Sequence, residues 1–206
     1  LCFINKMDKI GADFEMSVES IRDKLLAHPI PVQIPIGAEG EFQGLIDLLT
    51  MKAVYYTPEE TGSSFYEDEI PEALKDEAEI RRHEMIEAAA EYDESLMEAY
   101  IGDEEVSNEQ IIAGLRQGTI EGKLNPVLVG SALKNMGVRR LLDAVLNYLP
   151  SPLERPVVIG YKKGDKESPV EVLCDSSKSF IGLAFKITSD KHGDLYFLRI
   201  YQGMLK

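Results

Sequence analysis

Hydrophobic and polar positions follow two different patterns along this chain. Up to about residue 150, short apolar runs alternate with segments in which apolar residues recur every three or four positions. The first pattern is typical of β-strands and the second of amphipathic helices. Strands are expected at 1–5, 30–36, 51–57 and 125–129, and helices at 14–27, 72–91, 93–101, 111–117 and 138–149. This mixture predicts an α/β fold.

Two of the expected helices carry clear boundary signals. Ser107 followed by Gln110 predicts a capping box at a helix start. Pro150 and Pro152 stop the last helix, because proline cannot continue a helix. The spacing places apolar residues on one face of that helix: Val138, Leu141, Leu142, Val145, Leu146 and Leu149.

After Pro152 the pattern changes. Several short β-rich runs are separated by Gly and Asp turns, and no helical period is visible. We therefore predict a domain boundary near 151–156, with residues 1–152 in one domain and 153–206 forming an all-β module.

Charge is distributed unevenly. The 206 residues carry a net charge of −14. Residues 58–105 hold 18 Asp and Glu against three Lys and Arg, a net of −15, whereas the rest of the chain has a net of +1. Such an acidic stretch repels nucleic acid and attracts basic partners, although a solvated helical face explains it equally well.

Membrane and disulfide signals are weak. No apolar run approaches the roughly 18 residues that span a bilayer, and no signal-peptide pattern is present, so we expect no membrane partner. Cys2 and Cys174 lie in strand-like runs, which favours a reducing, cytoplasmic compartment without a disulfide.

The motif Asn5-Lys6-Met7-Asp8 directly follows an apolar strand. Guanine presents two donors on one edge, N1–H and the 2-amino group, and the carboxylate of Asp8 can accept from both. Asn5 can tie the loop to its neighbours and contact the base, and the aliphatic stem of Lys6 can lie along the base plane. An ordinary helix cap explains the motif equally well by itself.

A second short motif follows the strand at 125–129. Ser131, Ala132 and Leu133 come at its end, where a backbone N–H from Ala132 could donate to the guanine 6-oxo group and Leu133 could cover the ring. Alone, the motif reads as a turn. Two such motifs at the ends of parallel strands, where ligands bind, together favour a guanine site.

The spacing of the motifs predicts an insertion. Asp8 and Ser131 are 123 positions apart, whereas a strand–helix–strand unit needs roughly 30 residues. About 90 residues are therefore inserted, and we place an α+β subdomain that includes the acidic stretch at about 30–122.

Over nearly its whole length the sequence resembles the translational GTPase elongation factor G. The resemblance rests on FINKMDKIGADF, PIPVQIPIGAE, FQGLIDLLTMKAVYY, PVLVGSALKNMGVRRLLDAVLNYLPSP and GLAFKITSDKHGDLYFLRIYQGMLK. It implies the C-terminal half of a P-loop GTPase doubly wound domain, with the inserted subdomain, followed by the start of a β-barrel domain. It also implies that Asn5, Lys6, Asp8, Ser131, Ala132 and Leu133 bind the base of GTP or GDP.

The same resemblance implies a ribosome-dependent GTP hydrolase that drives tRNA and mRNA movement. The ribosome, its RNA, tRNA and mRNA would be partners of the full-length protein, and the acidic subdomain would meet the ribosomal stalk protein. A ribosomal protection protein, a release-factor GTPase, a non-translocating paralogue and a non-enzymatic acidic binding module remain alternatives.

Several parts of a GTPase are missing from this sequence. The phosphate-binding motif G-x-x-x-x-G-K-[ST] is absent, and Asp8-Lys9-Ile10-Gly11 overlaps the guanine motif and cannot also sense a γ-phosphate. Leu1 and the last residues lie inside strand patterns, so we expect an internal fragment whose Mg²⁺ ligands and catalytic histidine lie elsewhere. Alone, it should not hydrolyse GTP and should bind GDP no better than ~1 mM.

Other candidate residues carry weaker signals. His28, His83 and His192 lack partners for catalysis or zinc binding. The lysines of the closing β segment could bind RNA phosphates, but an exposed hairpin turn explains them equally well: Lys162, Lys163 and Lys166.

Overall fold

The computed structural model describes residues 1–57, 64–102, 104–191 and 193–205, without the side chain of Lys166. Contacts divide the chain into two compact units, Leu1–Leu149 and Pro150–Lys206. Six positions of the polar loop expected after residue 57, and His192, lie outside the described residues.

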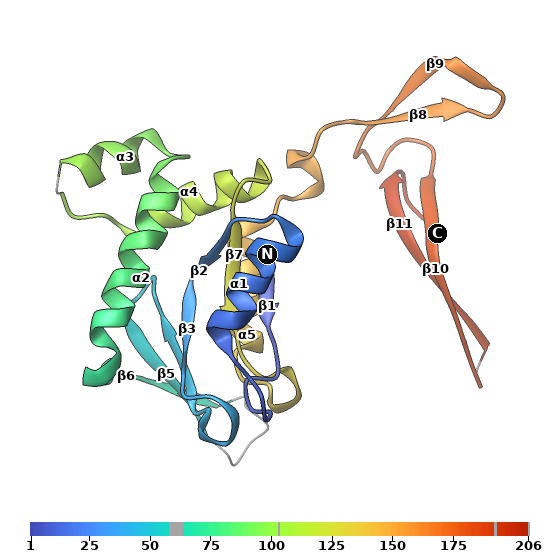
Figure 1. Ribbon diagram of the computed structural model, residues 1–206. Helices are drawn as coiled ribbons and strands as arrows, with labels where there is room; N and C mark the ends of the chain where they lie inside the picture. The colour runs from blue at the N-terminus through green and yellow to red at the C-terminus, as the bar shows by residue number, and fades with distance from the viewer. Residues whose placement is uncertain (58–63, 103, 192, 206) are drawn as a thin grey trace. The chain divides into compact units, whose positions relative to one another are not determined.

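A parallel sheet of three short strands lies in the first unit. Its order is β1 (Cys2–Ile4), β7 (Asn125–Val129) and β2 (Pro29–Pro31). Parallel strands need a crossover connection, and α1 (Phe14–Leu25) provides it between β1 and β2. Figure 1 shows α1 in front of these strands and α5 (Val138–Tyr148) behind them. β2 lies at the start of the expected insertion, yet it pairs with β7.

An antiparallel sheet forms the second layer of this unit. Its strands run in chain order: β3 (Gln33–Ile36), β4 (Gly44–Asp47), β5 (Lys52–Tyr56) and β6 (Phe65–Asp68). The side chains of Leu45, Ile46 and Val54 are completely buried. A Cβ at Gly44 would lie 2.0 Å from the Val54 carbonyl oxygen, so only glycine fits this close approach of two strands.

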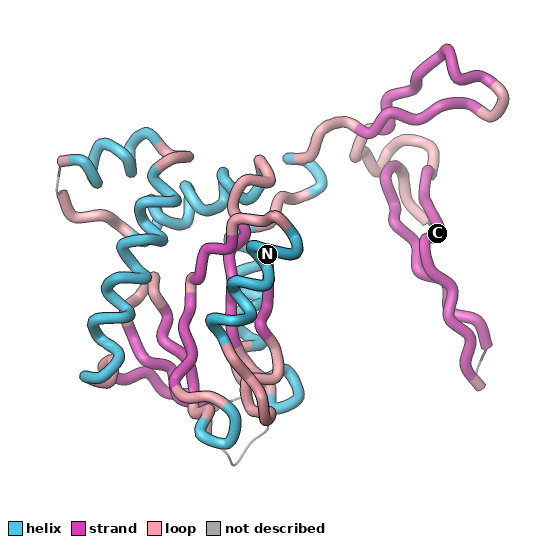
Figure 2. The backbone as a smooth tube through the Cα atoms, in the orientation of Figure 1, coloured by secondary structure: helices cyan, strands magenta, loops and turns pink. Residues whose placement is uncertain are grey.

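Three helices lie within the residues where an insertion was predicted: α2 (Glu72–Ala90), α3 (Glu94–Ile101) and α4 (Asn108–Ile120). They pack on one another, and α4 also contacts β7 and α5 (Figure 2). Gly114 allows α4 to approach α2 closely, because a Cβ there would lie 2.4 Å from the Ala89 carbonyl oxygen. The predicted capping box of Ser107 and Gln110 is confirmed.

Helix α5 is strongly amphipathic, but the apolar side predicted from spacing is only partly buried. Ala144 and Tyr148 are buried, whereas Leu142 is 62% and Leu146 is 78% exposed. Ala144 and Tyr148 therefore contribute the buried contacts of this helix. Leu141 packs against the core, whereas Leu142 and Leu146 of the predicted face are exposed.

Among its described residues, the second unit contains β-strands and one 3₁₀ turn, η3 (Pro152–Glu154). Two antiparallel hairpins are formed by β8 (Val158–Lys162) with β9 (Asp165–Val172), and by β10 (Ile181–Asp190) with β11 (Gly193–Gln202). The predicted all-β character is confirmed for this described part.

These elements confirm the α/β class predicted from the sequence, with one parallel sheet and separate antiparallel sheets. The assignments of a half GTPase domain, an inserted subdomain and a β-barrel remain predictions. In the described part of the chain, no helix combines the length and apolar composition required to span a bilayer.

Candidate guanine-binding site

Two loops meet at the carboxyl ends of β1 and β7. We call residues 5–11 the first loop and residues 130–136 the second loop. The strands pair in parallel, so both loops leave the sheet at the same edge. The Gly130 N–H donates to the Ile4 carbonyl oxygen at 3.0 Å, and the Met7 N–H donates to the Gly130 carbonyl oxygen at 3.1 Å. The sheet therefore brings together the two motifs that are far apart in sequence.

Asn5 joins the two loops through its side chain. Its Oδ1 accepts from the Lys6 N–H at 2.8 Å and from the Ala132 N–H at 2.9 Å. This contact agrees with the expected tying role of Asn5. The same hydrogen bond occupies the Ala132 N–H, which was predicted to donate to the guanine 6-oxo group. The contact between Ala132 and the base remains a prediction.

Both loops contain a non-glycine residue in the left-handed backbone region. Lys6 has φ 67° and Asn135 has φ 56°. Such conformations cost of order 1–3 kcal/mol and cluster at ligand-binding sites, where the surrounding structure holds them in place. Asparagine tolerates this region better than lysine, so the strain is concentrated in the first loop.

Asp8 lies between the two loops. Its side chain is 1% exposed, and its Oδ2 lies 3.5 Å from Lys9 Nζ and 3.4 Å from Lys134 Nζ. Neither carboxylate oxygen has a hydrogen-bond partner of good geometry among the described residues. Proximity to the Ser131 hydroxyl and then to these two lysines lowers the pKa of Asp8 against the opposing effect of burial.

An ionised carboxylate without a hydrogen bond of good geometry is unusual inside a protein, because most buried polar groups form hydrogen bonds. The two lysine head groups are too distant for short bonds, and their side chains are more than half exposed. The carboxylate of Asp8 can therefore accept two donors from a ligand once the exposed lysine side chains that cover its oxygens move aside. Guanine offers such a pair, so this feature fits the predicted ligand.

The second loop is compact and leaves a hydrophobic side chain outside. Ser131 is 1% exposed, and it exchanges two backbone hydrogen bonds with Met136, each 3.0 Å long. The 3₁₀ turn η2 (Ala132–Lys134) follows. Leu133 is 83% exposed at this turn. Its accessibility is compatible with the predicted contact to a base.

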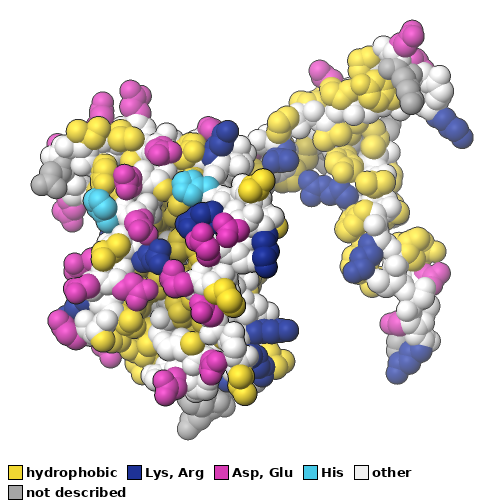
Figure 3. All heavy atoms as spheres, in the orientation of Figure 1, with side chains coloured by type: hydrophobic (Ala, Val, Ile, Leu, Met, Phe, Trp, Pro, Cys, Tyr) yellow, Lys and Arg dark blue, Asp and Glu magenta, His cyan; other side chains and the backbone are white. Residues whose placement is uncertain are grey.

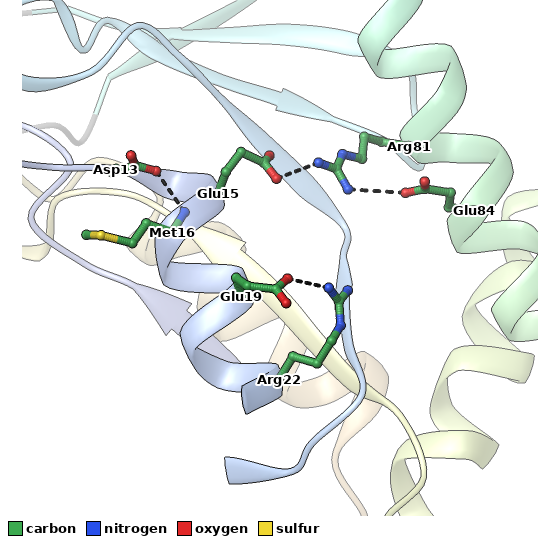
Figure 4. Close-up of polar contacts among 7 residues, drawn as sticks. All are labelled: Asp13, Glu15, Met16, Glu19, Arg22, Arg81 and Glu84. Atoms are coloured by element: carbon green, nitrogen blue, oxygen red, sulfur yellow. Dashed lines mark hydrogen bonds and ion pairs between the residues drawn. The ribbon is translucent and has the colours of Figure 1, made fainter. Parts of the chain in front are cut away.

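The helix that follows the first loop is fixed at its start and along its side. The Asp13 carboxylate caps α1 by accepting from the Met16 N–H at 2.8 Å. Glu15 pairs with Arg81 of α2 at 2.6 Å, and Arg81 also pairs with Glu84 at 3.2 Å (Figure 4). The first loop thus continues into a helix that is attached to the acidic region.

Sequence reasoning missed three charged residues near Asp8. Lys9 and Lys134 flank the predicted motifs and approach its carboxylate. Glu39, from the turn η1 (Glu39–Glu41), contacts the first loop. The lysines could have been suspected from their adjacency to the motifs, whereas no local signal marks Glu39.

Other residues singled out in the sequence have ordinary surroundings where the structure describes them. His83 Nε2 lies 2.9 Å from the Tyr100 hydroxyl, which gives it an ordinary side-chain contact. Lys162 and Lys163 are exposed, and Cys2 and Cys174 are free thiols. Among the described residues, no cluster of three His, Cys, Asp or Glu side chains could hold a metal ion.

The comparison with protein families identifies the domain that contains both loops. The family described as Elongation factor Tu GTP binding domain matches residues 1–151. This chain belongs to that family. Membership in the Elongation factor Tu GTP binding domain family agrees with a parallel sheet that presents two loops at one edge.

Curated relatives and a solved structure extend the likeness beyond this domain. The chain is 50% identical to Elongation factor G of Thermotoga neapolitana and of Thermotoga maritima, over 100% of its own length and 30% of theirs. It therefore spans about 30% of the length of these relatives. A crystal structure of a Thermus thermophilus protein matches 99% of this chain and 27% of its own, with a TM-score of 0.72 and 29% identity.

Proposed function

We propose that the two loops form the base pocket of a GTPase, and that the protein carrying this chain is an elongation factor G. In this proposal it is a ribosome-dependent GTP hydrolase that drives the movement of tRNA and mRNA. Its support is family membership over residues 1–151 together with 50% identity to proteins named Elongation factor G.

The buried carboxylate of Asp8, which lacks hydrogen bonds in the described chain, carries the proposal. Its oxygens accept from guanine N1–H and from the 2-amino group. Adenine has no such donor pair and would leave the carboxylate unpaired, which can reject an analogue by ~10⁴–10⁵-fold. Charge-assisted hydrogen bonds of this kind contribute roughly 1.5–3 kcal/mol each.

The other pocket residues surround the base. Asn5 holds the two loops together and contacts the base, and the stem of Lys6 lies along one face of the ring. Ser131 shapes the second loop, and Leu133 covers the other face. The Ala132 N–H donates to the 6-oxo group, which requires this amide to shift or to share its present bond with Asn5 Oδ1.

The pocket accounts for the base of GTP or GDP and leaves its phosphates to other residues. The sequence has no G-x-x-x-x-G-K-[ST] motif, and the described residues include no metal-binding cluster. The proposal therefore assigns the phosphate contacts, the Mg²⁺ ligands and the catalytic group to residues outside 1–206.

The acidic surface of α2 and α3 is the proposed contact for the ribosomal stalk protein. Asp and Glu side chains gather over these helices on the face shown in Figure 3. Those exposed on α2 are Glu72, Asp76, Glu77, Glu79, Glu84 and Glu87. Contacts with ribosomal RNA, tRNA and mRNA are proposed for the full-length protein, in the cytoplasm.

The decisive experiment exchanges the base preference in the full-length protein. In Asp8→Asn, the amide can donate to the 2-oxo group of xanthine, which replaces the guanine 2-amino donor. We expect GDP affinity to fall by about 100-fold, because two charge-assisted bonds are weakened, and XDP affinity to rise. Ribosome-stimulated hydrolysis should then depend on XTP, measured beside GTP in the same assay.

A charge-matched control separates base recognition from a general effect of charge. Asp23→Asn removes a carboxylate from the exposed side of α1 and should leave the preference for GDP unchanged. Full retention of guanine preference by Asp8→Asn would contradict the assignment of Asp8.

A further inference from the structure

The turn between β3 and β4 forms hydrogen bonds with the first loop on both sides of Asp8. The Glu39 N–H donates to the Met7 carbonyl oxygen at 2.7 Å. The Gly11 N–H donates to Glu39 Oε1, also at 2.7 Å. One residue of the inserted region therefore bonds the loop before and after the residue that is proposed to bind the base.

The turn that carries Glu39 is itself tightly constrained. Glu39 has φ 54° and Gly37 has φ 75°. A Cβ at Gly37 would lie 2.2 Å from the Glu41 carbonyl oxygen. The Glu41 N–H donates to the Ala38 carbonyl oxygen at 3.0 Å, and the next residue, Phe42, is buried in the core. A strained turn anchored in the core is a rigid support.

After Asp8, the described part of the first loop has few other hydrogen bonds to the rest of the chain. Its earlier half is joined to the second loop through Asn5 and Met7. In its later half, the Lys9 N–H donates to the Lys6 carbonyl oxygen at 3.0 Å, within the loop. In the described chain, the hydrogen bond that ties this later half to another segment is the one from Gly11 to Glu39.

We propose that Glu39 is a positioning residue for guanine recognition: it fixes the first loop so that both oxygens of Asp8 face the base. This inference rests on the proposed function of the pocket. A carboxylate that accepts from two donors at once must be correctly placed and oriented, because hydrogen bonds weaken steeply with misalignment. Loosening the loop therefore reduces the recognition of the 2-amino group first.

The test compares variants of the full-length protein for GDP and for IDP, whose base lacks the 2-amino group. In Glu39→Ala, the ratio of GDP affinity to IDP affinity should fall about tenfold, which corresponds to one lost charge-assisted bond. Glu39→Gly should lower the ratio of GDP affinity to IDP affinity by the same amount. Glycine adopts the left-handed backbone conformation without strain, so a folding defect would not explain the lower ratio. Glu39→Gln retains an acceptor oxygen and should stay within about twofold of the wild type.

Glu41→Ala is the matched control, because Glu41 is an exposed carboxylate in the same turn. It should leave the ratio unchanged. An unchanged ratio in both Glu39→Ala and Glu39→Gly would overturn the proposal, as would an equal loss of GDP and IDP affinity, which indicates a structural role alone.

Asp8→Asn, assayed in parallel, separates the proposed role of Glu39 from the proposed guanine pocket on which it depends. If Asp8→Asn loses guanine preference while the Glu39 variants keep theirs, only the role of Glu39 is wrong. If Asp8→Asn keeps guanine preference, the pocket assignment fails and the role of Glu39 fails with it.

Discussion

Two buried aspartates in the first unit have opposite surroundings. The side chain of Asp47, at the end of β4, is 8% exposed and that of Asp8 is 1% exposed. Asp47 accepts from the N–H groups of Leu49 at 3.0 Å and Thr50 at 3.4 Å, and it lies 3.3 Å from Arg140. Asp8 lies 3.4–3.5 Å from two lysines, and its carboxylate oxygens form no hydrogen bond of good geometry among the described residues.

The two carboxyl groups also differ in pKa. Burial raises the pKa of Asp47, although Arg140 and the two amides act against it. The Ser131 hydroxyl and the lysines lower the pKa of Asp8. The chain therefore supplies hydrogen bonds to Asp47, whereas it keeps Asp8 charged through neighbouring groups that form no hydrogen bond of good geometry with its carboxylate. A group that is held ionised and unbonded is suited to receive a ligand.

The largest expected effect on stability comes from breaking the Asp47 pair. Asp47→Ala leaves Arg140 without one of its two acidic partners and frees the amides of Leu49 and Thr50. Removing one partner of a buried pair is strongly destabilising, and Arg140 is 22% exposed, so we expect a loss of about 3 kcal/mol. Urea unfolding of the protein that carries this chain measures it.

Asp143→Ala is the control for this loss, because Asp143 is an exposed acid on α5. It should change the free energy of unfolding by less than about 0.5 kcal/mol. Asp47→Ala should also leave the ratio of GDP to XDP affinity unchanged. A changed ratio would show that Asp47 takes part in base recognition, and the contrast with Asp8 would fail.

A smaller effect on stability is expected at Asp8. Asp8→Asn removes a buried charge that has no hydrogen bond, and it gives up weak contacts to two largely exposed lysines. These two effects oppose each other, so the free energy of unfolding without nucleotide should change by no more than about 1 kcal/mol. A loss above about 2 kcal/mol, in the same urea experiment, would mean that Asp8 is a structural residue.

The smallest effect is a difference in pH dependence between the two positions. The lowered pKa of Asp8 gives the wild type a stability contribution that is present above pH 3.8 and is lost as pH falls through the folded-state value. The raised pKa of Asp47 acts in the opposite sense: its contribution declines as pH rises from 3.8 through the folded-state value.

These directions give a paired measurement. The stability of the wild type relative to Asp8→Asn should increase with pH below 3.8, and its stability relative to Asp47→Asn should decrease with pH above it. Urea titrations at a series of pH values on both sides of pH 3.8 measure these slopes. Slopes of the same sign would contradict the difference between the two aspartates.

Much of the candidate site could be predicted because it follows strands with strong hydrophobic patterns. The runs that precede Asn5 and Gly130 form neighbouring parallel strands, so their loops necessarily meet at one edge. The bond from the Ala132 N–H to Asn5 could not be predicted, because it depends on how two loops are oriented across 127 positions.

The exposed side of α5 shows the limit of periodicity. The spacing of Leu142 and Leu146 correctly indicates an amphipathic helix, yet both side chains are exposed while Tyr148 is buried. Periodicity specifies which residues share a face, but the neighbouring elements decide how much of that face is covered.

The sequence by itself determined the α/β class, the capping box of Ser107 and Gln110 and the residues of the two motifs, since these depend on local spacing and side-chain chemistry. Only the tertiary structure decided that Lys134 approaches Asp8 and that Glu39 holds the first loop. Such contacts join residues distant in sequence, and they form only when packing of the sheets and helices fixes the backbone of both partners.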